Sequence, residues 1–413
     1  MSDSASHQLA EYETAGEIEL GRGEVISSID LNTHIGDYPV YSSSAVGNGE
    51  FGRYGRYMFD EELITWSIDG GGRPFYRPKH KYSVTNVCGF LRIKRPDLWS
   101  YRYLHALLEK LQSGIQFDYQ MKAHPSVIRE LYRFPRIPMS HQLQIGNILD
   151  TLDTAIQQTE AILEKLKAVK QGLLHDLLTR GIDANGQLRP PQAEAPHLYK
   201  ESPLGWIPRE WEPAVLNDFV NAKRPIVYGI LMPGYGFPGG VPVVKVKDIF
   251  GGRIRSEDLL LTSPVIDREY SRSRLRSGDF LFTIRGSVGR TAFVPSHLND
   301  ANITQDTARI SVVDYDARFI RDFLAMPIAS TFISIHTLGV AVQGINLRDM
   351  RKIPILKPSK DEATEIANRL ETFDVRIERE AFMIKKMMDQ KKALMDDLLT
   401  GRVRVTPLLE KAA

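Results

Sequence analysis

Two stretches of the chain repeat one helical pattern of apolar residues. Counting alternately four and three residues from Ile145 to Leu177 gives apolar side chains at eight of ten positions, and the count from Ile366 to Leu398 gives eight of ten again. This is the a/d spacing of a coiled-coil seam, so we expect two helices of about 40 residues, each about 60 Å long. The apolar seam residues on which this interpretation rests are Leu149, Leu152, Ile156, Leu163, Leu173, Leu177, Leu370, Phe373, Ile377, Ile384, Leu394 and Leu398.

Proline, serine and glycine residues mark the ends of both helices. A proline lies before each start, Ser140 and Ser359 are plausible N-caps, and Gly181 and Gly401 follow the last periodic residues, as C-terminal caps do. The sequence therefore predicts helices over 140–181 and 358–401.

The helices belong to an internal repeat. The segment LKAVKQGLLHDLLT (166–179) matches MMDQKKALMDDLLT (387–400) at an offset of 221, and the match continues upstream to 149 and 370 without a gap. Slightly earlier, 136–138 resembles 352–354 at an offset of 216, so a five-residue insertion or deletion separates the copies. The plan is a first lobe (1–139), a helix (140–181), a linker (182–205), a second lobe (206–357), a helix (358–401) and a tail (402–413).

Two packing arrangements fit such helices. Each could pack on its own lobe, but a 40-residue amphipathic helix is too long for one small domain to cover. We favour antiparallel pairing of the two seams, with Lys170 and Lys391, which interrupt them, as register devices or partner contacts. The linker, with four prolines, argues against a helix or a central strand.

Both lobes have the pattern of mixed α/β domains. β-rich runs occur at 64–68, 82–87 and 90–93 in the first lobe and at 241–246, 279–284, 291–294 and 308–313 in the second. Short helices are expected at 103–111 and 319–326. The fold class is therefore α+β: two mixed lobes joined by two long antiparallel coiled-coil helices, with a pseudo-twofold internal repeat.

Composition narrows the class of protein. The chain has 413 residues, one cysteine (Cys88) and a net charge of +2, and no apolar run approaches the ~18–20 residues that span a bilayer. The N-terminal residues lack a basic start and an apolar stretch, so we expect no secretory signal and a cytoplasmic location. The second lobe holds 20 Lys and Arg against 15 Asp and Glu, and residues 20–139 hold 16 against 12, a mild excess that suits a polyanion.

Signatures of catalysis are missing from the sequence. Residues 47–52 and 234–239 fit GxGxxG, but neither run opens a predicted helix, so we expect turns that expose backbone and polar side chains and no bound dinucleotide. The sequence has no GxxxxGK[ST], HExxH or CxxC motif and no Asn/Asp-Pro-Pro-aromatic motif of amino-methyltransferases. We expect a non-catalytic chain without a metal or cofactor of its own.

Basic residues interleaved with aromatics and amides are the candidate DNA contacts. Arg and Lys suit phosphates and guanine edges, whereas Asn and Gln suit adenine. The candidates are Tyr41, Ser43, Asn48, Arg53, Tyr54, Arg56, Arg77, Lys79 and Lys81 in the first lobe, and Lys245, Lys247, Arg253, Arg272, Arg274, Arg285, Arg290, Gln343 and Asn346 in the second.

The whole plan resembles the specificity (S) subunits of type I restriction-modification systems. The resemblance rests on the helix ends KQGLLHDLLTRG (170–181) and KKALMDDLLTGR (391–402), on GWIP (205–208), and on SGDFLFTIRGSVG (277–289) and QGINLRDMRKIPI (343–355). The first lobe departs from the pattern because it lacks a GWIP-like entry, which leaves its acidic N-terminal segment a candidate for disorder.

The resemblance implies that each lobe is a target recognition domain for one half of a split double-stranded DNA site. The helices would space the lobes and dock two copies of a modification subunit, which binds S-adenosylmethionine and methylates adenine. A restriction subunit, with ATP and magnesium, would cut unmodified DNA. Two alternatives remain open: a coiled-coil scaffold with two protein-binding lobes, and a self-contained methyltransferase.

Overall fold

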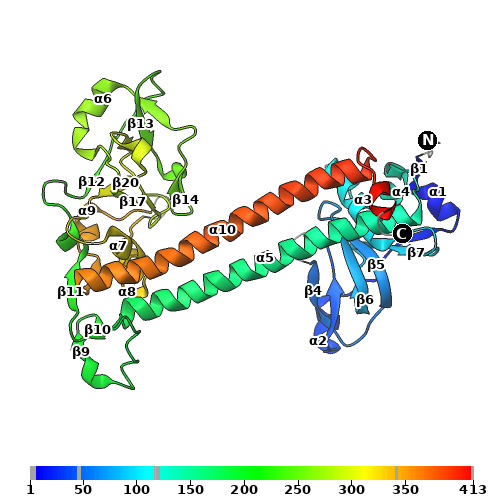
Figure 1. The fold of residues 1–413 in the computed structure, drawn as a ribbon, viewed down its shortest axis with the longest axis horizontal. Helices are drawn as coiled ribbons and strands as arrows, with labels where there is room; N and C mark the ends of the chain where they lie inside the picture. Colours follow the sequence, from blue (N-terminus) through cyan, green and yellow to red (C-terminus); the bar gives the residue numbers. More distant parts are fainter. Residues whose placement is uncertain (1–5, 44–47, 116, 118–120, 340–342, 411–413) are drawn as a thin grey trace. The chain divides into compact units, whose positions relative to one another are not determined.

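The computed structural model separates the chain into two compact units. The first unit holds residues 1–162 and 380–413, and the second holds 163–379. The structure describes all residues except 1–5, 44–47, 116, 118–120, 340–342 and 411–413. Each unit contains one lobe and the adjoining parts of two long helices, α5 (Met139–Thr179) and α10 (Lys360–Leu399) (Figure 1). Two mixed lobes and two long helices are thus confirmed.

The ends of the long helices follow the predicted chemistry with one exception. Helix α10 is capped by Ser359, whose Oγ accepts a backbone N–H of the first turn at 3.2 Å. Gly181 and Gly401 follow the helix ends with φ of 64° and 72°, a conformation that favours glycine. The prediction for Ser140 was wrong: it lies inside α5, because the carbonyl of Pro138 already accepts two N–H groups of the first turn.

The first lobe is built on one six-stranded sheet. Its order is β2-β7-β5-β6-β3-β4, antiparallel except for the β3–β6 pair. The strands are β2 (Ile18–Arg22), β3 (Tyr38–Tyr41), β4 (Glu50–Tyr54), β5 (Phe59–Ser67), β6 (Pro74–Val84) and β7 (Cys88–Ile93). The helices are α1 (Leu9–Thr14), α2 (Ser28–Thr33), α3 (Tyr101–Ser113) and α4 (Pro125–Leu131). The predicted runs overlap β5, β6 and β7, and the predicted helix falls within α3.

The core of the first unit joins this sheet to both long helices. Buried Trp66 and Leu91 from the sheet and Leu107 from α3 belong to one cluster with Leu149 of α5 and Leu398 of α10. In this unit each long helix therefore buries its apolar stripe partly against the lobe.

The described part of the N-terminal segment, from residue 6, contains regular secondary structure, so the expectation of disorder was wrong for these residues. Strand β1 (His7–Gln8) pairs with β8 (Arg133–Phe134), and α1 buries Leu9 and Tyr12 completely or nearly so. Apolar residues spaced three apart on an otherwise acidic helix carry this packing.

The second lobe consists of several small sheets. They are β12-β20-β17-β18, β16-β13-β19, β11-β21 and β14-β15. The strands are β11 (Glu212–Val215), β12 (Val227–Tyr228), β13 (Val241–Val244), β14 (Ile249–Phe250), β15 (Arg253–Ile254), β16 (Leu260–Thr262), β17 (Phe280–Thr283), β18 (Thr291–Phe293), β19 (Asn302–Ile303), β20 (Thr307–Ile310) and β21 (Pro354–Lys357). The helices are α6 (Pro264–Glu269), α7 (Ala317–Phe323), α8 (Pro327–Ile335) and α9 (Leu347–Met350). The predicted runs overlap β13, β17, β18 and β20, and the predicted helix overlaps α7.

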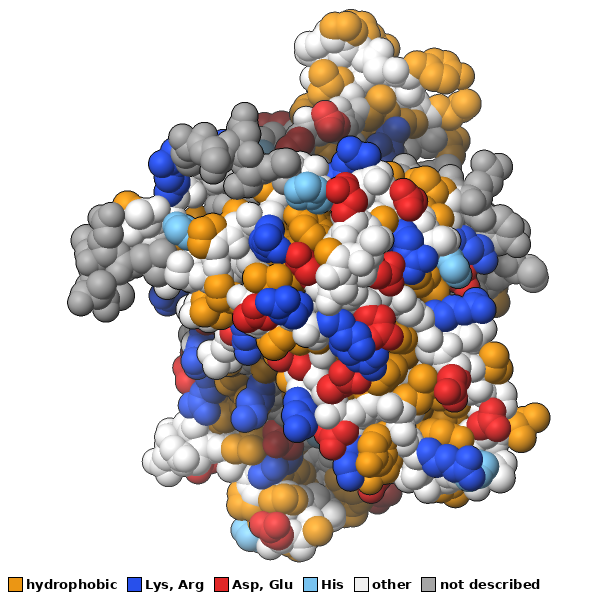
Figure 2. Space-filling model, turned by 90° about the vertical axis from the view of Figure 1, so that its right-hand side faces the viewer, with side chains coloured by type: hydrophobic (Ala, Val, Ile, Leu, Met, Phe, Trp, Pro, Cys, Tyr) orange, Lys and Arg blue, Asp and Glu red, His pale blue; other side chains and the backbone are white. Residues whose placement is uncertain are grey.

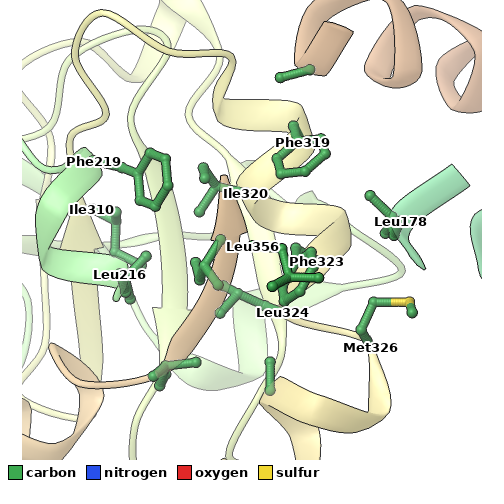
Figure 3. Packing of buried hydrophobic residues seen from close by; sticks show 14 of the residues in the cluster. Leu178, Leu216, Phe219, Ile310, Phe319, Ile320, Phe323, Leu324, Met326 and Leu356 are labelled. Carbon is green, nitrogen blue, oxygen red and sulfur yellow. The ribbon is translucent and has the colours of Figure 1, made fainter. Parts of the chain in front are cut away.

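The core of the second unit again joins the lobe to both long helices. Figure 3 shows Phe319 and Phe323 of α7 between Leu356 of β21 and Leu178 of α5. Leu370 of α10 belongs to the same cluster.

The linker is folded onto the second unit. A 3-10 turn (Pro196–Leu198) leads into a hairpin of β9 (Tyr199–Ser202) and β10 (Gly205–Pro208), which includes the GWIP segment. Arg189 forms an ion pair of 2.5 Å with Glu362 in the first turn of α10. Because this pair is almost fully buried, the linker holds the start of α10 in place.

Candidate nucleic-acid interface

In the first lobe, the candidate residues divide into a buried support and an exposed rim. The guanidinium of Arg77 lies 3.5 Å from the ring centre of Tyr41 and donates to Thr65 Oγ1 at 3.0 Å and to the Asn48 carbonyl at 2.6 Å. Both Tyr41 and Arg77 are buried, and burial lowers the pKa of Arg77. Arg77 thus supports the backbone at Asn48, and both side chains are shielded from solvent.

The exposed rim lies on β3, β4 and β6 and the turns beside them. Its exposed members are Asn48, Arg53, Arg56, Lys79 and Lys81, while Ser43 and Tyr54 are half-buried. Lys81 Nζ lies 4.8 Å from the ring centre of Tyr57, and Arg53 donates to the Asp37 carbonyl at 3.1 Å. Cations held against rings and carbonyls lose less conformational freedom on binding a phosphate than free side chains do.

In the second lobe, two loops distant in sequence form one surface. Arg285 pairs with Gly344 in a β-bridge, and Gly286 N donates to the Gln343 carbonyl at 2.9 Å. Arg285 and Gln343 are therefore brought together, and both side chains are exposed. A cleft of about 510 Å³ beside them is lined by Ser287, Gly289, Ser330, Thr337 and Gln343, among others.

Asn346 has a structural task at the edge of this surface. It is the N-cap of α9: its Oδ1 accepts the Asp349 N–H at 2.8 Å, and its Nδ2 donates to the Asp349 carboxylate at 2.6 Å. The two groups that would recognise adenine are thus both engaged within the lobe. Arg290, by contrast, is exposed and makes a 3.3 Å contact with the Ile249 carbonyl.

The remaining second-lobe candidates lie around β13 and its neighbours. Lys247 and Arg272 are exposed, and Lys245 is half-buried. Arg253 forms an ion pair with Glu378 of α10, and Arg274 forms one with the buried carboxylate of Asp267. These two arginines therefore hold elements of the second unit together.

An exposed apolar loop of the second lobe was missed from the sequence. Residues 231–237 overlap the second GxGxxG run (234–239), and Met232, Tyr235 and Phe237 are 78%, 107% and 47% exposed. The expectation that this turn exposes polar side chains was wrong, although no helix follows it. The first GxGxxG run begins at residue 47, which lies outside the described residues. Ile230, fully buried at the base of the second-lobe loop, holds that loop on the lobe.

Charge on the visible face of the first unit is mixed. Lys and Arg side chains are interspersed with Asp and Glu, with apolar side chains between them (Figure 2). The mild basic excess therefore does not form a field of one sign on this face.

The long helices contact each other through their seams within each unit. All twelve apolar seam residues are buried or half-buried. In the second unit Lys170 Nζ lies 2.5 Å from Asp374 Oδ1, and in the first unit Lys391 Nζ lies 2.7 Å from Asp153 Oδ1. The two seam lysines therefore each join α5 to α10.

Among the residues that the structure describes, no cluster of three or more His, Cys, Asp and Glu side chains could hold a metal ion. None of the described helices is both long and apolar enough to cross a membrane.

Two mixed lobes on shared long helices define a two-lobed, helix-linked protein, and comparison with known proteins identifies the family. The sequence model of the type I restriction modification DNA specificity domain matches residues 16–168 and 208–386, so the chain belongs to that family. Because the match occurs twice, it also confirms the internal repeat. Members of this family are non-catalytic specificity subunits, as expected from the missing catalytic motifs.

Individual relatives agree with this assignment. The chain is 30% identical over 244 residues to the type I restriction enzyme EcoBI specificity subunit of Escherichia coli, covering 57% of this chain and 50% of that protein. It is 23% identical over 357 residues to the type I restriction enzyme MjaVIII specificity subunit of Methanocaldococcus jannaschii, covering 84% and 80%. The alignment thus spans half the length of the E. coli relative.

A solved structure has the same fold. The crystal structure of a type I restriction-modification system S subunit from M. genitalium superposes with a TM-score of 0.59 at 13% identity, covering 96% of each chain.

Proposed function

We propose that this chain selects the DNA sequence on which a type I restriction-modification complex acts, with each lobe recognising one half of a two-part site. The observation that carries the proposal is the double family match, one match to each lobe and helix. Each lobe also carries its own exposed set of cations and amides, Arg53, Lys79 and Lys81 in the first and Arg285 and Gln343 in the second. Arg bound to guanine or phosphate and Gln bound to adenine are the contacts that such residues favour.

Two modification subunits, in this proposal, dock on the long helices. Each unit leaves apolar side chains of these helices uncovered: Phe382 and Met388 in the first, Val169 and Val375 in the second. A contiguous apolar patch on a helix is typical of a surface that a partner covers, and these side chains are the candidates for such a patch. The modification subunits would bring S-adenosylmethionine, and a restriction subunit would bring ATP and magnesium.

The decisive experiment co-expresses the chain with its modification subunit and maps methylated adenines across a genome. We expect methylation confined to a two-part sequence with an unread spacer, absent when the chain is omitted. Methylation that does not depend on the chain, or that follows a single continuous sequence, would overturn the proposal.

A salt titration separates DNA recognition from the scaffold alternative. A complex that neutralises several phosphates should lose about 10³–10⁵-fold in duplex affinity between 50 and 200 mM salt. A scaffold with two protein-binding lobes should bind duplex DNA weakly throughout that range.

A further inference from the structure

The two lobes attach to the long helices through equivalent residues, although their sheets differ. Arg102 lies in the first turn of α3 in the first lobe and forms an ion pair with Asp150 of α5. Arg318 lies in the first turn of α7 in the second lobe and forms an ion pair with Glu371 of α10. The two arginines correspond at the offset of 216 and the two acids at the offset of 221, which are the two offsets of the internal repeat. The same arginine–acid contact therefore occurs in both copies of the internal repeat, although the lobe sequences resemble each other only loosely.

A small residue lies one helical turn before each acid. Gly146 lies close to α3, since a Cβ built there would be 3.1 Å from Arg102 Cβ. Its counterpart in the repeat, Ala367, is fully buried in the core of the second unit. Small side chains at these positions let a lobe helix approach a long helix closely enough for the arginine to reach the acid.

A second ion-pair cluster in each unit joins three helices. In the first unit, Lys391 of α10 contacts Asp153 of α5 at 2.7 Å and Glu109 of α3 at 2.8 Å. In the second unit, Asp374 of α10 contacts Lys170 of α5 at 2.5 Å and Arg321 of α7 at 3.6 Å. Lys170 and Lys391 are equivalent positions of the repeat, as are Asp153 and Asp374, so one lysine–aspartate pair occurs twice.

These clusters are shielded from solvent more than ordinary surface ion pairs. The side chains of Lys391, Glu109 and Asp153 are 14%, 29% and 33% exposed. Burial acts to lower the pKa of Lys391, but the two carboxylates outweigh it and leave the pKa above its usual value. The lysine therefore remains charged and bound between two helices, which restricts how they can shift.

We propose that the three-helix bridges Lys391–Asp153–Glu109 and Lys170–Asp374–Arg321 position each lobe on the long helices and so fix the spacer between the two DNA half-sites. This inference rests on the proposed function. The bridges touch no candidate DNA contact, so they act on the placement of a lobe and not on the bases it recognises. In this proposal the charged side chains of the two bridges fix the register of the long helices, which is the role that the sequence suggests for Lys170 and Lys391.

The test uses the complete complex with its modification subunit. The combined variant Glu109→Gln, Asp153→Asn and Lys391→Met removes the bridge of the first unit without leaving an unpaired charge. We expect both half-site sequences to be kept while sites with a spacer one base pair longer or shorter gain methylation by about tenfold relative to the parental spacer. The milder Asp153→Asn variant, which keeps the Lys391–Glu109 pair, should give a smaller broadening and covers the case in which the triple variant does not assemble.

Two controls isolate positioning from stability. Lys167→Met removes an exposed lysine whose partner, Glu164, is on the same helix, and Lys391→Arg keeps the charge of the bridge; both should keep the parental spacer. Uniformly weaker methylation with an unchanged spacer distribution in both bridge variants would overturn the inference. A parental complex that methylates no two-part site would instead overturn the proposed function.

Discussion

The two lobes differ in their sheets and agree in how they are attached. The first lobe spreads its residues over one six-stranded sheet, whereas the second divides them among sheets of two to four strands. Yet Arg102 and Arg318 each open a lobe helix and pair with an acid on a long helix. The two lobes therefore differ most in the parts that lie away from the long helices. In those parts each lobe presents its own exposed side chains.

One attachment breaks this agreement. Glu362, in the first turn of α10, accepts from Arg189, from the backbone of Ile182 and from Trp211 Nε1. Its counterpart in the repeat, His141 in the first turn of α5, has one 3.4 Å contact with Thr406. The start of α10 is thus held through Glu362 by a buried ionic network. The start of α5 is held one residue after His141 by the neutral side chain of buried Gln142, which accepts from the Ser100 N–H and donates to the carbonyls of Leu98 and Ile137.

The largest expected effects come from placing a charge in equivalent core positions. Leu149 and Leu370, which correspond in the repeat, are both at most 2% exposed. Leu149→Asp or Leu370→Asp buries an unpaired carboxylate, and we expect either to lower the free energy of unfolding by about 4 kcal/mol. Chemical denaturation followed by circular dichroism measures the loss.

Val169, an exposed position on α5, offers a control. Val169→Asp places the same carboxylate in solvent and should change stability little. A Leu149→Asp protein with the parental denaturation midpoint would show that the first unit does not depend on the α5 contact.

The second prediction compares Glu362 in the first turn of α10 with His141 at the equivalent position of α5. Glu362→Gln removes the buried counter-charge of Arg189 and leaves only the exposed carboxylate of Glu210, 3.7 Å away, so we expect the free energy of unfolding to fall by about 3 kcal/mol. His141→Gln, at the equivalent position, should cost at most about 1 kcal/mol. Denaturation midpoints of the two variants test the contrast, and equal losses would contradict it.

The helices and the repeat were predictable because their signals are long and periodic. Eight apolar residues in ten positions specify a buried stripe, and glycine at Gly181 and Gly401 specifies a helix end. The predicted cap at Ser140 was wrong because the carbonyl of Pro138, two residues earlier, already accepts the first N–H groups of the helix, a local choice that residue type alone does not decide.

The candidate site was harder to predict, because side chains of one type serve different tasks. Arg77 and Arg285 look alike in sequence, but one is buried against Tyr41 and the other is exposed. The pairs that Arg102 and Arg318 form with the long helices were missed, although the repeat contained a signal for them. Applying the two repeat offsets to the charged residues, and not only to the apolar ones, singles out both pairs.

The third prediction compares two second-lobe residues: Asn346, which stabilises α9, and Gln343, an exposed candidate for contact with DNA. Asn346→Ala removes the cap of α9 and should cost about 1 kcal/mol of stability, with the methylated sequence unchanged. Gln343→Ala touches only an exposed side chain, so it should leave stability unchanged and weaken or relax one half-site by about 1–3 kcal/mol. Methylation mapping and denaturation of both variants measure the two effects, and a relaxed half-site in Asn346→Ala alone would reverse the assignment.

The smallest expected effect compares two equivalent helix positions away from the lobes. Gly172 of α5 and Ala393 of α10 correspond in the repeat, both are exposed, and a Cβ added at Gly172 would meet no atom within 4 Å. Glycine in the middle of a helix is less favourable than alanine by about 0.8–1.0 kcal/mol, because the unfolded chain has more freedom to lose. Gly172→Ala should therefore raise the free energy of unfolding by nearly that amount, and Ala393→Gly should lower it equally. Denaturation of the two single variants and of the double variant, which should match the parent, measures both changes. Opposite shifts of equal size would show that the two long helices are equivalent where neither touches a lobe, whereas a loss of stability in Gly172→Ala would mean that this glycine is required by a contact of its own.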